Sequence, residues 1–256
     1  MDSVNRTWYS RPEAVASFAG DDLLEPALAL LLVRYREWIV ERDVLDIGVG
    51  AGRTTRYLAA LTTRYVGIDY SSSMVGHCAA RYPGVRIELG DARDLSRFAT
   101  GSFDFTLFSY AGLDALGPDD RGGAIHEVRR VVRPGGIFAF STHNRDFADA
   151  HLGPQPRWSR NPVTLVANVG RWARDVRNHR RLMTLERETS EFALINDVAE
   201  HFSLIHYYIT ASAQRAQLEQ AGFEVISVTD DQGAEVPQGA VATRAPWLWY
   251  VARRPA

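Results

Sequence analysis

Short apolar runs alternate with mixed segments along this chain. The first run is Val44–Ile47, and later runs cover residues 65–68, 85–89, 102–109 and 137–141. Such runs, apolar at most positions, are typical of strands buried inside a sheet. The segments between them have helical spacing over residues 53–61, 71–82 and 119–132. The alternation predicts an α/β fold with a doubly wound, mostly parallel sheet.

Two stretches depart from this alternation. Residues 1–36 include the start of an amphipathic helix over residues 23–40, and we interpret them as an N-terminal helical cap. Residues 142–203 match no strand–helix repeat, and loops longer than about 12–15 residues are usually functional or disordered. We predict a mainly helical substrate lid there, inserted into a single domain of residues 1–256. Its expected small core comprises Trp158, Leu165, Val166, Trp172 and Phe192.

Composition and net charge exclude several kinds of chemistry and binding partner for this chain. It has 256 residues, a net charge of −2 and no lysine, which excludes Schiff-base chemistry. Because this charge creates no global field, we expect neither nucleic acid nor membrane as a partner. Cys78 is the single cysteine, and the apolar run at residues 27–33 is too short to span a bilayer. Without a signal-peptide pattern, the expectation is a cytoplasmic protein, with a homodimer left open.

A glycine turn separates the first two predicted strands. Gly48, Gly50 and Gly52 follow the first strand, Asp46 lies two residues before the turn, and Asp69 ends the second strand. Glycines let the backbone approach a ligand closely, and the following helix presents free N–H groups. The spacing differs from the G-x-G-x-x-G dinucleotide fingerprint. A carboxylate beside the turn repels a pyrophosphate but favours a ligand that carries an ammonium and a sulfonium.

This arrangement resembles the first two motifs of class I S-adenosylmethionine (SAM)-dependent methyltransferases. The resemblance implies that Asp69 holds the ribose of SAM and that Tyr70 and Met74 lie near its adenine. After the third strand, Asp91 and the adjacent Ala92 match the position where an acid accepts a hydrogen bond from the adenine amine.

The same resemblance extends to later strands. The strand over residues 102–109 matches the family strand that ends beside the transferable methyl group, so Ser109 is a candidate cofactor contact. The family trait before the fifth strand is present as Val-Arg-Pro-Gly-Gly, and an Ala-Gly-Phe turn precedes the sixth, at residues 222–228. In this family the last strand, here residues 247–252, lies antiparallel between the fifth and sixth. The implied fold is a Rossmann-like, seven-stranded sheet, with Tyr9 of the cap as a further cofactor contact.

The implied reaction is transfer of a methyl group from SAM, which leaves S-adenosylhomocysteine. We expect a small-molecule acceptor, a specialised metabolite methylated on oxygen or nitrogen. A hydroxyl acceptor needs a general base, and the candidates are His143, just past the fifth strand, and His206. Both could instead be structural. The acids and histidines show no ligand spacing for a metal, so none is expected.

Two other classes stay open. A nucleotide-dependent oxidoreductase could use the same sheet, although the glycine spacing and Asp91 argue against it. A SAM-binding subunit without catalysis would carry the same cofactor residues, so only tests with acceptors separate it from an enzyme.

Overall fold

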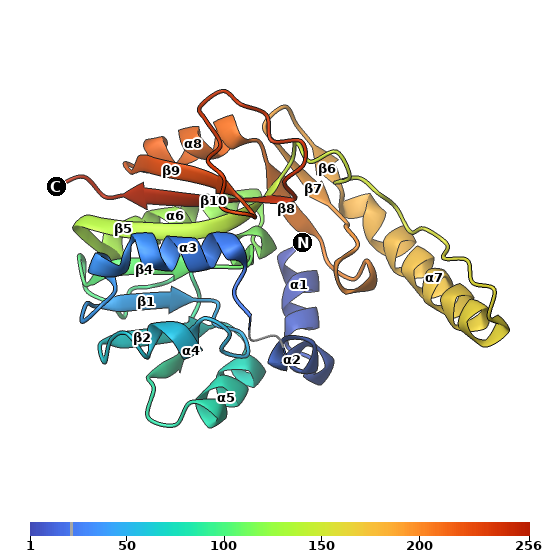
Figure 1. The fold of residues 1–256 in the computed structure, drawn as a ribbon, viewed down its shortest axis with the longest axis horizontal. Helices are drawn as coiled ribbons and strands as arrows, with labels where there is room; N and C mark the ends of the chain where they lie inside the picture. Colours follow the sequence, from blue (N-terminus) through green and yellow to red (C-terminus); the bar gives the residue numbers. More distant parts are fainter. Residues whose placement is uncertain (21–22) are drawn as a thin grey trace.

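The computed structural model describes residues 1–20 and 23–256. Its centre is a mixed sheet (Figure 1), in which seven strands follow the order β3-β2-β1-β4-β5-β10-β9. These strands are β1 (Val44–Ile47), β2 (Tyr65–Asp69), β3 (Ile87–Leu89), β4 (Phe103–Phe108), β5 (Val132–Asn144), β9 (Glu224–Asp230) and β10 (Trp247–Arg253). β10 is antiparallel to both of its neighbours. The predicted Rossmann-like sheet with an antiparallel last strand is confirmed.

Helices cover both faces of the sheet. One apolar cluster joins α3 (Pro26–Arg34) and α4 (Thr55–Leu58) to the sheet residue Trp249. The other joins α6 (Pro118–Val131) and α8 (Ala211–Gln220) to Tyr250. Because neighbouring residues of a strand point to opposite faces, β10 contributes to both clusters. A further helix, α5 (Ser72–Arg81), follows β2, and Ser71 caps it through its side chain.

The predicted lid contains short strands beside its helix, which the sequence-based expectation did not include. β5 continues to Asn144, and three more strands extend the sheet beside its end: β8 (His206–Ile209), β7 (Phe192–Ile195) and β6 (Arg187–Glu188). β8 runs parallel to β5, with His143 opposite Tyr208. These strands are only two to four residues long, and a period-2 pattern is difficult to recognise over so few positions.

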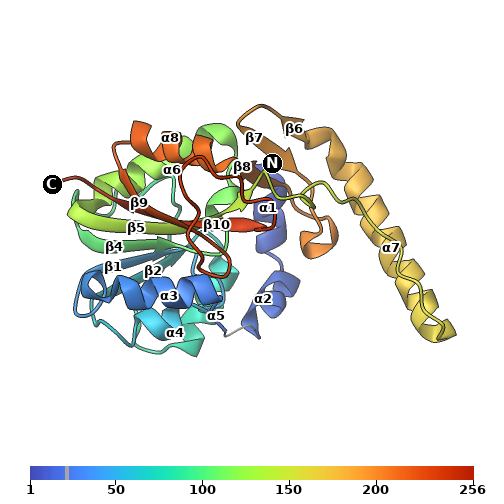
Figure 2. The ribbon, with the colours of Figure 1, turned by 45° about the horizontal axis from the view of Figure 1, so that its top comes forward.

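The helical part of the insertion is α7 (Pro162–Leu182), which projects away from the sheet in both views (Figures 1 and 2). The expected small core around it is wrong. Trp158 is 84% exposed and Val166 is 73% exposed, whereas only Asn168 and Leu182 of this helix are buried. Among the described residues, no helix is long and apolar enough to cross a membrane.

The N-terminal cap contains more than the single predicted helix. α1 (Asp2–Tyr9) and α2 (Pro12–Ala19) precede α3, and a short 3-10 turn, η1 (Arg36–Trp38), follows it. Residues 21–22 of the predicted cap lie outside the described residues. α1 packs through Trp8 on a cluster that contains Met74 of α5 and Leu204. The cap therefore bridges the cofactor half of the sheet and the insertion.

Candidate functional site

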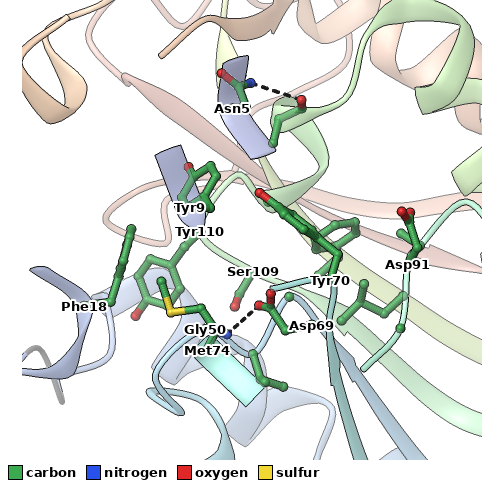
Figure 3. A pocket seen from close by; sticks show the side chains of 18 of the residues that line it. Asn5, Tyr9, Phe18, Gly50, Asp69, Tyr70, Met74, Asp91, Ser109 and Tyr110 are labelled. Atoms are coloured by element: carbon green, nitrogen blue, oxygen red, sulfur yellow. Dashed lines mark hydrogen bonds between the residues drawn. The ribbon is translucent and has the colours of Figure 1, made fainter. Parts of the chain in front are cut away.

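A cavity lies at the carboxyl ends of the parallel strands, beneath α1 and α2 (Figure 3). This is the edge where open α/β sheets bind their ligands. Each of the first four strands, or the turn after it, contributes to the wall, and so do both cap helices. The lining residues used below are Asn5, Arg6, Tyr9, Phe18, Gly48, Gly50, Asp69, Tyr70, Met74, Asp91, Ala92, Ser109, Tyr110, Gly112 and Ala115.

The glycine turn has two functions. Gly50 has φ +53 and would have nothing within 4 Å of an added Cβ, so its open side leaves room for a ligand. Gly52 has φ +93, and a Cβ there would lie 2.5 Å from the Tyr82 ring and 2.9 Å from Cys78 Sγ. Gly52 therefore allows the turn to pack on α5 and is not among the residues that line the cavity, so its role as a cofactor contact stays a prediction.

Asp69 is the carboxylate at the centre of the cavity. Its Oδ2 accepts a hydrogen bond from the Gly50 N–H at 2.9 Å, and its Oδ1 accepts one from the Ser71 N–H at 2.8 Å. Burial raises its pKa even though both backbone donors lower it. The two donors fix the carboxylate in one orientation, ready to accept hydrogen bonds from a diol.

Asp46 lies under the turn and is not among the residues that line the cavity, so its role toward the cofactor stays a prediction. Its Oδ2 accepts hydrogen bonds from Thr54 Oγ1 at 2.6 Å and from the Tyr65 hydroxyl at 2.8 Å. Its Oδ1 is buried and has no hydrogen-bond partner in the described structure. Burial raises the pKa of Asp46 to about 7. Asp46 therefore braces the turn from behind.

Asp91 ties the cap to the end of β3. Arg93 donates to both of its carboxylate oxygens, at 3.0 Å and 2.8 Å, and Arg6 of α1 forms an ion pair with it. Burial alone would raise the pKa of Asp91, but the hydrogen bonds from Arg93 lower it overall. Arg6 also lies over the Tyr70 ring, 4.8 Å from its centroid. The acid that was expected to face adenine thus also holds α1 over the cavity.

Aromatic and apolar side chains form the remaining wall (Figure 3). Tyr9 meets Tyr70 edge to face, with ring centroids 6.3 Å apart, and Phe18 lies 6.1 Å from Tyr9. Burial raises the pKa of Tyr9 above its usual range, so its hydroxyl stays neutral. Met74 and Tyr110 line the same cavity. This wall suits a flat, apolar group such as a nucleobase.

The structure brings most of the predicted cofactor residues together. Gly48, Ala92 and Ser109 also line the cavity, so Asp46 and Gly52 are the two predicted residues that do not. Sequence reasoning missed Asn5, Arg6 and Phe18. The helical spacing of Asn5 and Tyr9, one turn apart, places them on one face of α1, and this was the available signal.

His143 and His206 lie beside the cavity and do not line it. Their rings stack with centroids 4.9 Å apart. His143 Nδ1 is 2.8 Å from Asp114 Oδ2, and His206 Nδ1 is 2.7 Å from Asp197 Oδ2. Because an ionised carboxylate only accepts, each Nδ1 carries a proton in these contacts. Burial alone would lower the pKa of His206, but Asp197 raises it overall. The structure thus pairs each histidine with a buried acid, a pairing that the sequence did not reveal.

Asp114 is the charged centre of this cluster. It lies on η2 (Gly112–Ala115), whose Gly112 and Ala115 line the cavity. The Arg121 guanidinium, fully buried, donates to Asp114 at 2.5 Å, and Thr142 Oγ1 donates at 2.6 Å. Burial alone would raise the pKa of Asp114, but Arg121 and His143 lower it, so the carboxylate stays ionised.

Asp197, the second buried acid, forms a group of possible metal ligands together with His143 and His206. Ligand atoms of His143, Asp197 and His206 lie within 4.8 Å of one another. Asp197 Oδ2 also accepts a hydrogen bond from the Tyr208 hydroxyl at 2.8 Å. The contacts of His143 with Asp114 and of His206 with Asp197 have hydrogen-bond lengths. We therefore interpret these residues as two hydrogen-bonded pairs. The absence of a metal stays a prediction.

The cavity fits SAM on its own geometry. It offers an oriented carboxylate for a ribose, an open glycine at the turn and a flat aromatic wall.

The comparisons with known proteins agree with this geometry. The family described as "Methyltransferase domain" matches residues 44–136. A probable S-adenosylmethionine-dependent methyltransferase of Mycolicibacterium smegmatis is 36% identical over 104 residues, which cover 41% of this chain and 39% of the relative. A demethylmenaquinone methyltransferase of Beutenbergia cavernae is 38% identical over 102 residues, 39% of this chain and 41% of the relative. The matches therefore span about two-fifths of the length of these relatives.

Solved structures match over nearly the whole chain. The CcbJ methyltransferase from Streptomyces caelestis has a TM-score of 0.63 and 17% identity, covering 98% of this chain and 99% of its own. The 1,6-didemethyltoxoflavin-N1-methyltransferase of Burkholderia thailandensis, solved with S-adenosylhomocysteine, has a TM-score of 0.60 and 19% identity, covering 99% of this chain and 88% of its own. At this identity the likeness concerns the fold. The domain match and the curated relatives show a methyltransferase domain over residues 44–136 that is similar to those of SAM-dependent methyltransferases.

Proposed function

We propose that this chain transfers the methyl group of SAM to an oxygen or nitrogen of a small-molecule acceptor, a specialised metabolite. The observation that carries the proposal is the Asp69 cavity at the carboxyl ends of the strands, covered by α1 and α2. The buried Asn5 side chain fixes this cover to Ala115 and Ile205. A covered cavity favours a small acceptor over a macromolecule.

When bound, SAM supplies a methyl group on a positively charged sulfur, and the protein mainly aligns the partners and excludes water. Asp69 holds the ribose, while Tyr70 and Met74 pack near the adenine. Tyr9 and Phe18 close the cavity from the cap. The name of the toxoflavin neighbour, an N1-methyltransferase solved with its small-molecule acceptor, supports the same acceptor class.

His143 is our candidate for the base that takes the acceptor's proton. Its Nδ1–H is held by the ionised Asp114, so Nε2 can accept a proton, and 14% of its side chain is exposed. The positive charge formed on His143 would be stabilised by Asp114. His206 is less exposed, at 7%, and supports the His143 ring by stacking, which makes it a positioning residue.

Cofactor binding is the first test. In calorimetric titrations, S-adenosylhomocysteine should bind the wild-type protein and NADH should not. Asp69→Ala should bind S-adenosylhomocysteine about 10- to 100-fold more weakly, because hydrogen bonds to a charged group are lost. Asp94→Ala, which changes an exposed acid outside the cavity, is the matched control. Binding of NADH alone would replace the proposal by the oxidoreductase alternative.

Turnover is the second test, and it separates an enzyme from a non-catalytic SAM-binding subunit. Methyl transfer from labelled SAM is measured with a panel of hydroxyl, amine and quinone acceptors, the quinone because three similar relatives are named demethylmenaquinone methyltransferases. His143→Gln should lower kcat and leave the affinity for S-adenosylhomocysteine unchanged. His126→Gln, at an exposed position of α6, should change neither. Equal kcat in both variants would remove His143 as the base.

A further inference from the structure

A second cleft lies on the other side of the cap, between α1–α2 and the projecting arm α7. It opens where the turn after β7, η4 (Ala199–His201), meets the arm. The lining residues come from three separate parts of the chain and are Trp8, Arg11, Glu13, Arg174, Arg177, Asn178, Arg181, Glu200, His201 and Ser203. It shares no lining residue with the cofactor cavity.

Arginines dominate this cleft. Arg11 enters from the cap, and Arg177 and Arg181 enter from α7, one helical turn apart. The side chains of these three form no ion pair with any described residue. The arm, taken as α7 with the segment that leads into it, is positively charged along its length. Residues 151–182 hold seven arginines and one aspartate, a net charge of +6 in a chain of net charge −2. Arg11, Arg177 and Arg181 therefore bring three positive charges to the cleft without an ion-pair partner among the described residues, although Glu13 and Glu200 line the same cleft.

Hydrogen bonds between α7 and the η4 turn hold the base of the cleft in place. Asn178 donates to the His201 carbonyl at 2.8 Å and to Ser203 Oγ at 3.1 Å. His201 contacts Arg174 through Nε2 at 2.8 Å and Asp175 through Nδ1 at 3.1 Å. Glu200, His201 and Phe202 all have positive φ, a conformation that costs side-chain-bearing residues energy. The arm holds this strained turn in place, so the cleft keeps a fixed shape.

We propose that this cleft binds a phosphate-type anion, carried by a small molecule or by a lipid headgroup. A guanidinium offers a planar fork of donors that matches phosphate oxygens, and three forks from two elements can surround one group. Glu13 and Glu200 also line the cleft, where they accept hydrogen bonds from hydroxyl or ammonium groups of the same ligand. Glu200 already accepts one from Ser17 Oγ at 3.1 Å. The site is independent of methyl transfer, so it can be tested without an acceptor.

The test uses inorganic pyrophosphate as the probe, in calorimetric titrations of the full chain at constant ionic strength. Wild type should bind it saturably. The double variant Arg177→Gln/Arg181→Gln should bind at least about tenfold more weakly, because two forks are removed from the cleft. The matched control, Arg160→Gln/Arg180→Gln, removes the same charge from arm positions that do not line the cleft and should bind like wild type.

Two readouts make the result decisive. S-adenosylhomocysteine binding should be unchanged in both double variants, which verifies folding and keeps this test separate from that of the methyltransferase. Sedimentation with phosphatidylglycerol vesicles shows whether the bound phosphate belongs to a lipid. Vesicle binding that pyrophosphate displaces would assign the site to a lipid headgroup. Pyrophosphate binding without vesicle binding would assign it to a free small molecule. Absence of saturable pyrophosphate and vesicle binding in wild type, or an equal loss in the control, would overturn the proposal.

Discussion

The substitution Asp114→Asn tests how the buried charges beside the cavity are balanced. Arg121 is fully buried, and its hydrogen-bond partners are Asp114, Thr142, Gln214 and Gln217. Asp114 is the one carboxylate among these partners. Asparagine keeps the shape of the side chain but leaves the Arg121 charge without a counter-charge.

The structure sets the magnitude of this effect. Removing one partner of a buried ion pair costs about 3–5 kcal/mol of unfolding free energy, because the other charge stays buried and uncompensated. For a chain of this size that corresponds to a fall of about 10 °C in Tm. The matched control is Asp120→Asn, whose ion pair with Arg93 is at 3.0 Å and has an acid side chain 44% exposed. It should cost less than about 1 kcal/mol.

Equilibrium unfolding in urea, followed by circular dichroism, measures both variants. The double variant Asp114→Leu/Arg121→Met should be less destabilised than the sum of its single variants, since no lone charge remains. The reasoning is refuted if Asp114→Asn costs no more than Asp120→Asn. It is also refuted if the double variant loses the full sum.

Two further predictions concern the glycine turn and its surroundings. Burial raises the pKa of Asp46 from 3.8 to about 7. Between these pH values the folded protein keeps a proton on Asp46 that the unfolded chain has released. The stability of the folded protein therefore falls as pH rises from 3.8 to about 7. Asp46→Asn should therefore gain about 2–3 kcal/mol relative to wild type between pH 5 and pH 7 in urea titrations, and parallel curves would contradict this. Gly52→Ala should lower the free energy of unfolding by about 1–3 kcal/mol, because the added Cβ would lie 2.5 Å from the Tyr82 ring and because Gly52 has φ +93. Gly76→Ala, in the open interior of α5, should instead gain about 0.5–1 kcal/mol, and a loss in both would refute the argument.

The sequence predicts the strands of this fold well because buried parallel strands are continuous apolar runs. β1, β2 and β4 follow this rule, as their residues are nearly all buried. The antiparallel place of β10 came from the family resemblance, since periodicity carries no information on strand direction. The cofactor roles of the residues at strand ends also came from the family resemblance, and these residues lie together because carboxyl ends of parallel strands meet at one edge.

The remaining features depend on contacts between distant residues. Asp114 and His143 are 29 positions apart, and nothing in either segment indicates their hydrogen bond. Nothing in the segment around Asp197 indicates its contacts with both His206 and Tyr208. Trp158 is exposed, so aromatic content alone wrongly predicted a core in the insertion. Packing of this kind is decided by tertiary structure, which local patterns do not encode.

The buried Asn5 side chain has a consequence for the catalytic cycle. Its amide donates to the Ala115 and Ile205 carbonyls at 3.1 Å and 2.7 Å, and its oxygen accepts from the Ile205 N–H at 3.1 Å. One residue thus fastens the cover of the cofactor cavity to both halves of the molecule. On the proposed function, we expect S-adenosylhomocysteine to leave when these three hydrogen bonds open. We therefore expect product departure, rather than bond making, to set the pace of repeated turnovers.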